Sequence, residues 1–357
     1  MNATELLKEY KKSVDPVLGA YFKKKIKEAE RMDPLAKQAL KMLEDFTMSG
    51  GKRIRPALVY YGYLAAGVKK KENILEASMS IELTHVFLLI HDDIIDKDEK
   101  RHGVDTIHTR YEKISQKYFP KKNGEHFGNS MAMLVGDMAA AMGNEIIFRS
   151  NFAPKTIINA LDKLQEIVYR IVPGEMKDVY LEMRGNATEK EILDMYEGKT
   201  SSYSFEGPLH LGAVLAGKND PDFFKDLSEY SMSVGKAFQL RDDILGIFGD
   251  EKKIGKPIGS DVTEGKQTVL VIKALENGSK KQIAEMKRLL GKEDITLSEM
   301  DSFRRIIKET GSLEYSEKLM EKLVKKSFSS LDRIDFKSKE AEDFLRGIAA
   351  YMIEREV

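Results

Sequence analysis

The sequence predicts an all-α protein, a single-domain bundle of about ten or more helices over residues 1–357. Strong helix formers such as alanine, leucine, glutamate and lysine are abundant, and only 9 prolines occur in 357 residues. Capping boxes, in which a threonine precedes a glutamate by three positions, mark helix starts at Thr188 and Thr296. Strands are not expected, because no alternation of apolar and polar residues is flanked by turn residues.

Three apolar segments organise the expected bundle. Residues 73–96 are predicted to form one long helix, apolar over most of its second half, which suggests a central position. Residues 205–217 and 232–248 share this character. The breaks between helices are short and do not resemble interdomain linkers; they fall at 48–56, 121–125, 151–154, 184–187, 217–221 and 249–265.

Composition excludes several classes of function. The 58 basic and 58 acidic residues cancel, so no overall field attracts nucleic acid or an anionic membrane. The absence of cysteine excludes disulfides, thiolate metal sites and cysteine nucleophiles, and fits a reducing cytoplasm. The charged N-terminus lacks the apolar run of a signal peptide, and uninterrupted apolar stretches are too short for a membrane span. We therefore expect a cytoplasmic protein.

An acid motif ends the long helix predicted at 73–96. Asp92, Asp93 and Asp96 follow an apolar run, and Asp92 and Asp96 lie one turn apart on the same face. Such neighbouring carboxylates repel each other unless a cation lies between them. Hard oxygen ligands without a thiolate favour Mg²⁺, usually completed by water and substrate phosphate.

A second acid pair repeats this pattern at Asp242 and Asp243, again after an apolar run. Two such motifs facing each other could hold several Mg²⁺ ions around one diphosphate. One alternative is a solvated acidic helix end, which one motif alone would not exclude. Another is the His91-Asp92 doublet of a metal phosphohydrolase, which does not explain the remaining aspartates of the first motif.

Basic residues flanked by glycine lie near both acid motifs. Lys52, Arg53 and Arg55 follow two glycines in SGGKRIRP, where the backbone can approach a ligand and the cations can bind diphosphate oxygens. Considered alone, this segment reads as an ordinary solvated basic turn. A second segment, KIGKPIGSDVTEGKQT, has the composition of a basic loop that closes over a phosphate ligand.

Together the motifs resemble the trans-prenyl diphosphate synthases, the farnesyl and geranylgeranyl diphosphate synthases and their relatives. The motifs that carry the resemblance run in family order: GGKRIRP, HDDIID, Gly136-Asp137, GKT at 198–200, FQLRDDILG and GKPIGSDVTEGKQT. The form DDILG with GSDVTEGK is similar to archaeal and some bacterial members. The resemblance implies an isoprenoid synthase-like helical fold around a central cavity, and a homodimer.

The resemblance also implies roles for individual residues. Isopentenyl diphosphate would be bound by Lys52, Arg55, His85 and His102. Asp92, Asp96 and Asp242 would bind about two or three Mg²⁺ ions. Asp93, Asp243 and Lys199 complete the expected catalytic set, and the allylic diphosphate would be contacted by Arg101, Lys199, Thr200, Gln239, Lys256 and Lys266.

Two positions depart from the family pattern. His102 stands where the family usually has a second arginine after the first acid motif, and the imidazole is a weaker, pH-dependent substitute for binding isopentenyl diphosphate. Gly246 stands where the second motif usually ends in aspartate, which leaves Asp242 and Asp243 to act. The glycine variant is similar to archaeal-like members.

Phe87, five residues before Asp92, lies at the position where the family places part of the floor that stops chain elongation. The next residue, Leu88, is not aromatic, a pattern that resembles archaeal geranylgeranyl synthases. We therefore expect geranylgeranyl diphosphate as the product, with farnesyl or farnesylgeranyl diphosphate as alternatives. Two other functions remain open: a class I terpene cyclase, and a non-catalytic subunit of a heteromeric synthase.

Overall fold

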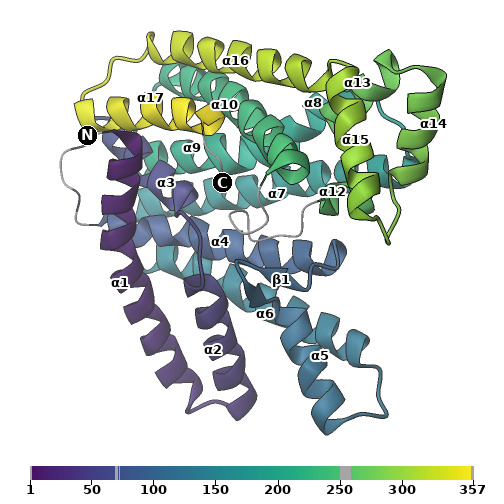
Figure 1. The fold of residues 1–357 in the computed structure, drawn as a ribbon. Helices are drawn as coiled ribbons and strands as arrows, with labels where there is room; N and C mark the ends of the chain where they lie inside the picture. Colours follow the sequence, from purple (N-terminus) through teal and green to yellow (C-terminus); the bar gives the residue numbers. More distant parts are fainter. Residues whose placement is uncertain (1, 69–70, 72, 250–258, 355–357) are drawn as a thin grey trace. The chain divides into compact units, whose positions relative to one another are not determined.

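A computed structural model describes residues 2–68, 71, 73–249 and 259–354, and almost every element in them is a helix (Figure 1). The all-α prediction is thus confirmed. Contacts divide the chain into two compact units: unit 1 (Met1–Leu164, Leu211–Lys218 and Lys337–Ala341) and unit 2 (Gln165–His210, Asn219–Phe336 and Glu342–Val357). The single domain over 1–357 stays a prediction.

Apart from Leu211–Lys218 and Lys337–Ala341, unit 1 is built from the N-terminal helices and ends inside α7. Its elements are α1 (Ala3–Ala29), α2 (Pro34–Met48), α3 (Ile54–Ala65), α4 (Ile74–Ile95), β1 (Lys100–Arg101), β2 (Val104–Asp105), α5 (Ile107–Tyr118), α6 (Gly124–Phe148) and the start of α7 (Pro154–Arg184).

Unit 2 contains most of the C-terminal helices. Its elements are the rest of α7, α8 (Glu189–Tyr196), the π-helix η1 (Glu197–Glu206), the start of α9 (Gly207–Leu215), α10 (Pro221–Phe248), α12 (Ser260–Thr263), α13 (Val269–Asn277), α14 (Lys280–Leu289), α15 (Leu297–Glu309), α16 (Ser312–Leu331) and most of α17 (Lys339–Glu354). α10 and α16 lie side by side (Figure 1).

Both capping boxes expected from the sequence are present. Thr188 accepts a hydrogen bond from the Glu191 amide at the start of α8, and Thr296 accepts one from Glu299 at the start of α15. In each box the glutamate side chain accepts a hydrogen bond from the threonine backbone N–H, so two of the free N–H groups at the helix start are satisfied. α1 and α14 begin with further boxes, which use Asn2 and Ser279.

α4 is the long helix expected over 73–96, and most of it is buried. Burial is greatest in its first half, where even Ser78, Ser80 and Thr84 are enclosed. α6 packs along α4 and runs antiparallel to it. The contacts show the direction: Gly143 lies against Ser80 and Thr84, whereas the earlier Gly136 lies against the later His91. A side chain at either glycine would clash with α4, so the two helices approach closely only because these positions lack a Cβ.

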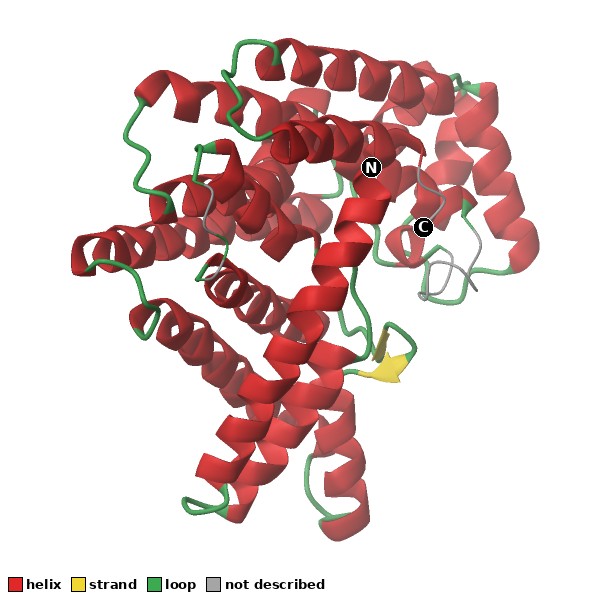
Figure 2. Ribbon diagram, turned by 90° about the vertical axis from the view of Figure 1, so that its left-hand side faces the viewer, coloured by secondary structure: helices red, strands yellow, loops and turns green. Residues whose placement is uncertain are grey.

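A small antiparallel hairpin follows α4 and was not expected from the sequence (yellow in Figure 2). Each strand has only two residues, too short for an alternating pattern to be visible. His102 and Gly103 form its turn with φ angles of 52° and 79°. Two consecutive positive φ angles match the twist of a tight hairpin, and glycine adopts them most easily.

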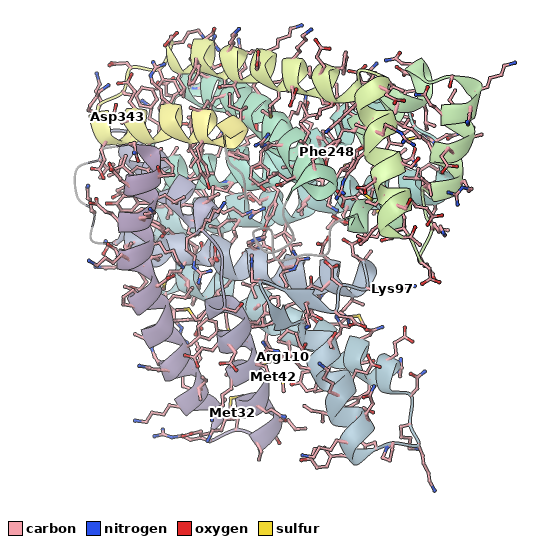
Figure 3. The ribbon with its side chains drawn as sticks, in the orientation of Figure 1. Met32, Met42, Lys97, Arg110, Phe248 and Asp343 are labelled. Carbon is pink, nitrogen blue, oxygen red and sulfur yellow. The ribbon has the colours of Figure 1, made fainter. Side chains whose placement is uncertain are left out.

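α5 and α2 are joined through the side chain of Arg110. Its guanidinium donates to the carbonyl oxygens of Asp105 at 2.9 Å and of Met42 at 3.4 Å, and it lies beside Met42 in Figure 3. Lys97, labelled in the same view, follows the end of α4.

Two helices, α4 and α6, are long and apolar enough to cross a membrane when judged by length and composition alone. Their apolar windows include polar residues, which is why no uninterrupted run of that length is visible in the sequence. In the structure 61% of the α4 window and 44% of the α6 window are buried. Buried core helices of soluble proteins meet the same two criteria.

Gly212 provides a test of close helix packing in unit 1. A Cβ at this position of α9 would lie 2.1 Å from the carbonyl oxygen of Val59 in α3. We expect Gly212→Ala to lower the free energy of unfolding by about 1–3 kcal/mol, because backbone must move to admit the methyl group. Chemical denaturation measures the change.

Gly19 is the matched control, because a Cβ at this position of α1 would meet nothing within 4 Å. Gly19→Ala should stabilise the protein by about 0.5–1 kcal/mol through higher helix propensity. Equal effects of the two substitutions would contradict the proposed contact.

Candidate functional site

The first acid motif lies at the C-terminal end of α4, where its adjacent aspartates have different surroundings. Asp92 and Asp96 are half-buried, whereas Asp93 is fully buried. Consecutive helical residues point about 100° apart, so one of two neighbouring aspartates must turn inward. Asp96 caps the helix by donating its backbone N–H to the carbonyl oxygen of Asp92 at 2.8 Å. The two outward carboxylates are those predicted to bind metal.

Arg101 of β1 holds the acidic residues around the end of α4. Its Nε donates to Asp93 Oδ1 at 2.6 Å, and its Nη2 lies 3.4 Å from Asp92 Oδ2 and 3.1 Å from Asp98 Oδ2. Burial raises the pKa of Asp93 to about 7, although the attraction of Arg101 opposes the rise. The other oxygen of Asp93, Oδ2, is buried without a hydrogen-bond partner among the described residues.

The turn of the hairpin brings His102 to the glycine-rich segment before α3. A Cβ on Gly50 would lie 2.8 Å from the Cγ atom of His102, so the imidazole packs directly against that backbone. Lys52 follows two residues later and is half-buried. The structure therefore places two of the residues predicted to bind isopentenyl diphosphate on neighbouring segments of unit 1.

Arg55 and His85 of the same predicted set are in direct contact. Arg55 Nη1 lies 2.9 Å from His85 Nε2. Because a guanidinium can only donate, His85 Nε2 accepts this bond and the imidazole is neutral. Burial lowers the pKa of His85 well below 6.5, and the positive charges of Arg55 and Arg101 lower it further.

The predicted chain-length residues lie one to two turns before the acid motif on α4. Phe87 is half-buried, and its ring meets the edge of the His91 ring at a centroid distance of 4.8 Å. A Cβ on Gly136 of α6 would lie 3.6 Å from the Phe87 ring. Leu88 is also half-buried. The Gly136-Asp137 pair recognised in the sequence thus allows α6 to pack beside Phe87.

The second acid motif, on α10 of unit 2, has the same division between adjacent aspartates. Asp242 is half-buried and Asp243 is buried. Tyr196 donates its hydroxyl to Asp243 Oδ2, and Gln239 Nε2 donates to Asp243 Oδ1 at 3.1 Å. Burial raises the pKa of Asp243 to about 8, and these hydrogen bonds moderate the rise.

Hydrogen bonds extend from Asp243 to three other elements. Thr200 of η1 donates to Gln239 Oε1 at 2.7 Å, and the backbone N–H of Val269 donates to the Tyr196 hydroxyl at 3.3 Å. Thr200 and Gln239 were predicted together and lie together. The sequence interpretation missed Tyr196, because a buried tyrosine at the end of an amphipathic helix carries no signal that separates it from the core.

Lys199 lies where η1 crosses α7. Its Nζ contacts Glu175 Oε1 at 2.9 Å and Asp178 Oδ2 at 2.6 Å. A Cβ on Gly174 would lie 2.5 Å from the Lys199 backbone nitrogen, so the absence of a side chain there lets the two helices meet. π-helices occur often at functional sites, and apolar periodicity in the sequence did not reveal this one.

The remaining predicted residues follow α10. Lys266 forms an ion pair with Glu264 at 2.7 Å. Lys256 lies outside the described residues. Gly246, where the family usually has aspartate, faces the Asp261 carboxylate: a Cβ there would lie 2.5 Å from Asp261 Oδ2. The glycine thus leaves room for another carboxylate beside the second acid motif.

The carboxylates of each unit fit a Mg²⁺ ion that also binds water and a phosphate. Among the described residues no group of three or more histidine or acidic side chains could hold a metal ion by itself. Mg²⁺ commonly takes only one or two protein carboxylates and completes its shell with water and substrate phosphates. Asp92 and Asp96, one turn apart and half-buried, are suited to that role.

Comparisons with known proteins identify relatives over most of the chain. The model of the family described as polyprenyl synthetase matches residues 36–308. A geranylgeranyl diphosphate synthase of Sulfolobus acidocaldarius is 35% identical over 86% of this chain and 88% of its own length. A geranylfarnesyl diphosphate synthase of Aeropyrum pernix is 31% identical over 86% of this chain and 91% of its own.

A solved structure agrees with this fold. The geranylgeranyl pyrophosphate synthase of Corynebacterium glutamicum, crystallised with isoprenyl diphosphate and magnesium, superposes with a TM-score of 0.88. It is 32% identical, and the match covers 95% of this chain and 98% of that chain.

The lowered pKa of His85 predicts a pH dependence of stability. Below pH 6.5 the unfolded chain protonates this imidazole, whereas the folded protein keeps it neutral, so acid favours unfolding. We expect the free energy of unfolding to fall as the pH decreases through 6.5. His85→Gln keeps an acceptor for Arg55 and should flatten this decrease in urea titrations. His126→Gln, at an exposed position of α6, is the control and should leave the slope unchanged.

Proposed function

Because the chain belongs to the polyprenyl synthetase family, we propose that it is a Mg²⁺-dependent trans-prenyltransferase. It condenses isopentenyl diphosphate head to tail with an allylic diphosphate, and geranylgeranyl diphosphate is its main product. The observation that carries the proposal is that the two acid motifs have the same arrangement. In each motif a half-buried aspartate is followed directly by a buried, hydrogen-bonded one. Farnesyl and farnesylgeranyl diphosphate are the alternative products.

Asp92 and Asp96 of unit 1 and Asp242 of unit 2 are assigned to Mg²⁺. All three are half-buried, so the free-energy cost of ionising their carboxyl groups is lower than for the buried Asp93 and Asp243. When bound, Mg²⁺ supplies positive charge that stabilises the diphosphate leaving group.

The cationic residues of unit 1 are assigned to isopentenyl diphosphate. Arg55 is oriented by His85, and Lys52 and His102 lie on segments that touch. Neutral His85 accepts from Arg55, so the guanidinium keeps a positive charge that can attract phosphate oxygens. Histidine carries a positive charge only when it is protonated, whereas an arginine at position 102 would always carry one.

The residues of unit 2 are assigned to the allylic diphosphate. Lys199 and Lys266 are donors that can bind diphosphate oxygens. The Thr200 hydroxyl donates to Gln239 Oε1 at 2.7 Å, so Thr200 would bind a diphosphate oxygen only after its O–H turns away from Gln239. Arg101 of unit 1 and Lys256 complete the assigned set. Positive side chains at the leaving group are the electrostatic contribution that speeds ionisation.

The reaction then needs no side chain as a nucleophile. The allylic C–O bond breaks and its electron pair leaves with diphosphate, which produces a resonance-stabilised cation. The double bond of isopentenyl diphosphate attacks this cation and forms the new C–C bond. Loss of a proton to the departing diphosphate restores a double bond. The protein holds the two substrates in reacting positions and excludes water.

Removing the outward aspartates tests the assignment. We expect Asp92→Ala and Asp242→Ala each to lower turnover by at least ~10²-fold while circular dichroism stays unchanged, because charge on the leaving group is no longer neutralised. Incorporation of labelled isopentenyl diphosphate measures turnover. Asp45→Ala and Asp301→Ala remove carboxylates that are 72% exposed and should leave turnover intact.

The same assay separates the competing functions. A class I terpene cyclase would convert farnesyl diphosphate alone into a hydrocarbon, whereas a synthase requires isopentenyl diphosphate. A non-catalytic subunit would be inactive when purified by itself. Near-normal turnover of either aspartate variant would contradict the proposed metal sites.

Phe87 is proposed to form part of the floor that ends elongation. Its ring is half-buried on α4, contacts the His91 ring at a centroid distance of 4.8 Å and lies beside Gly136 of α6. Phe87→Ala should shift the product toward longer chains, because the space left by the ring admits another isoprene unit. Chromatography of dephosphorylated products measures the shift. Phe148→Ala, with a ring that is 67% exposed, should leave the product spectrum unchanged.

A cytoplasmic homodimer stays a prediction from the sequence and the family resemblance. Light scattering of the purified chain measures the oligomeric state directly.

A further inference from the structure

Arg53 differs from its basic neighbours in the segment before α3. Lys52 and Arg55 are half-buried, but Arg53 is only 4% exposed. The sequence presents the three as one basic cluster, and the alternative interpretation was a solvated turn. The structure separates them, because the middle cation points into the protein and cannot contact a ligand in solvent.

The Arg53 guanidinium binds a different helix with each of its three nitrogens. Nε lies 2.9 Å from Asp15 Oδ1 on α1, Nη1 lies 2.5 Å from Glu82 Oε1 on α4, and Nη2 donates to the Thr47 carbonyl oxygen on α2 at 2.8 Å. A planar fork is required to reach three acceptors at once, and a lysine ammonium on a flexible stem cannot reproduce it. Arg53 therefore ties α1, α2 and α4 together at the start of α3.

Charge around the buried Arg53 guanidinium is balanced. Lys11 lies 2.6 Å from Asp15, so two cations face the two carboxylates Asp15 and Glu82. A buried guanidinium without these partners would be costly, whereas a paired and hydrogen-bonded one fixes a single geometry. The cluster is suited to hold a backbone segment in place.

The backbone at this point is in an unusual conformation. Arg53 has φ = 57°, in the left-handed region, and Gly51 has φ = 88°. A non-glycine residue persists there only where its surroundings hold it. The segment is held on two sides, by the Arg53 contacts and by the His102 ring against Gly50. This conformation determines the directions in which Lys52 and Arg55 leave the chain.

We propose that Arg53 is a positioning residue, which fixes residues 49–55 so that Lys52 and Arg55 are directed at the diphosphate of the isopentenyl substrate. Arg53 itself does not touch the substrate. This inference rests on the proposed function. It predicts that weakening the Arg53 cluster impairs isopentenyl diphosphate selectively and leaves the allylic substrate largely unaffected.

Arg53→Lys is the direct test, and Glu82→Gln is a second variant that keeps shape while removing one charge. We expect Arg53→Lys to raise the KM for isopentenyl diphosphate about tenfold or more, to change the KM for geranyl diphosphate less than twofold, and to lower kcat little. Calorimetry with isopentenyl diphosphate alone should show the same loss of affinity. Glu82→Gln should have a smaller effect of the same kind.

Arg110→Lys is the matched control, because Arg110 also joins two helices of unit 1 through carbonyl oxygens but does not contact residues 49–55. It should lower thermal stability without changing the KM for isopentenyl diphosphate. Unchanged isopentenyl affinity in both cluster variants, or equal increases in both KM values, would overturn the positioning role. If the wild-type protein neither binds nor consumes isopentenyl diphosphate, the proposed function fails and the role of Arg53 fails with it.

Discussion

Two adjacent aspartates on a buried helix cannot both face solvent, and much of the candidate site follows from that constraint. On α4 and on α10 the second aspartate of the pair turns inward, where an isolated carboxylate would be very costly. Asp93 is stabilised by Arg101, and Asp243 by Tyr196 and Gln239. Arg101 lies on β1, Tyr196 on α8 and Gln239 on α10 itself. The hydrogen bonds of each inward aspartate therefore connect its motif to a neighbouring element.

Close contact between helices is the second requirement, and glycine makes it possible where site residues lie. Gly136 lets α6 approach α4 beside Phe87, and Gly174 lets α7 approach η1 beside Lys199. Backbone that comes this near leaves no space for a Cβ, so each glycine lets one helix approach closely an element that carries predicted site residues. The packing and the chemistry of the site therefore depend on the same positions.

Local signals in the sequence predicted the parts of the structure that depend on neighbouring residues. The threonine–glutamate capping boxes, the long helix of α4 and the shared face of Asp92 and Asp96 all follow from helical geometry over a few residues. The β1–β2 hairpin was missed because its strands are too short to show a pattern. The π-helix η1 was missed because its hydrogen bonds differ from those of an α-helix while its composition does not.

By itself, the sequence determined the helical class of the protein, the family motifs and the residue types available for binding metal and diphosphate, because these depend on composition and short spacing. Only the tertiary structure decided which of the similar residues face inward. Arg53 is buried between Lys52 and Arg55 because Asp15 and Glu82, distant in the chain, converge on it. The hydrogen bond from Tyr196 to Asp243 likewise joins two residues on different helices, so it could not be predicted from their spacing in the sequence.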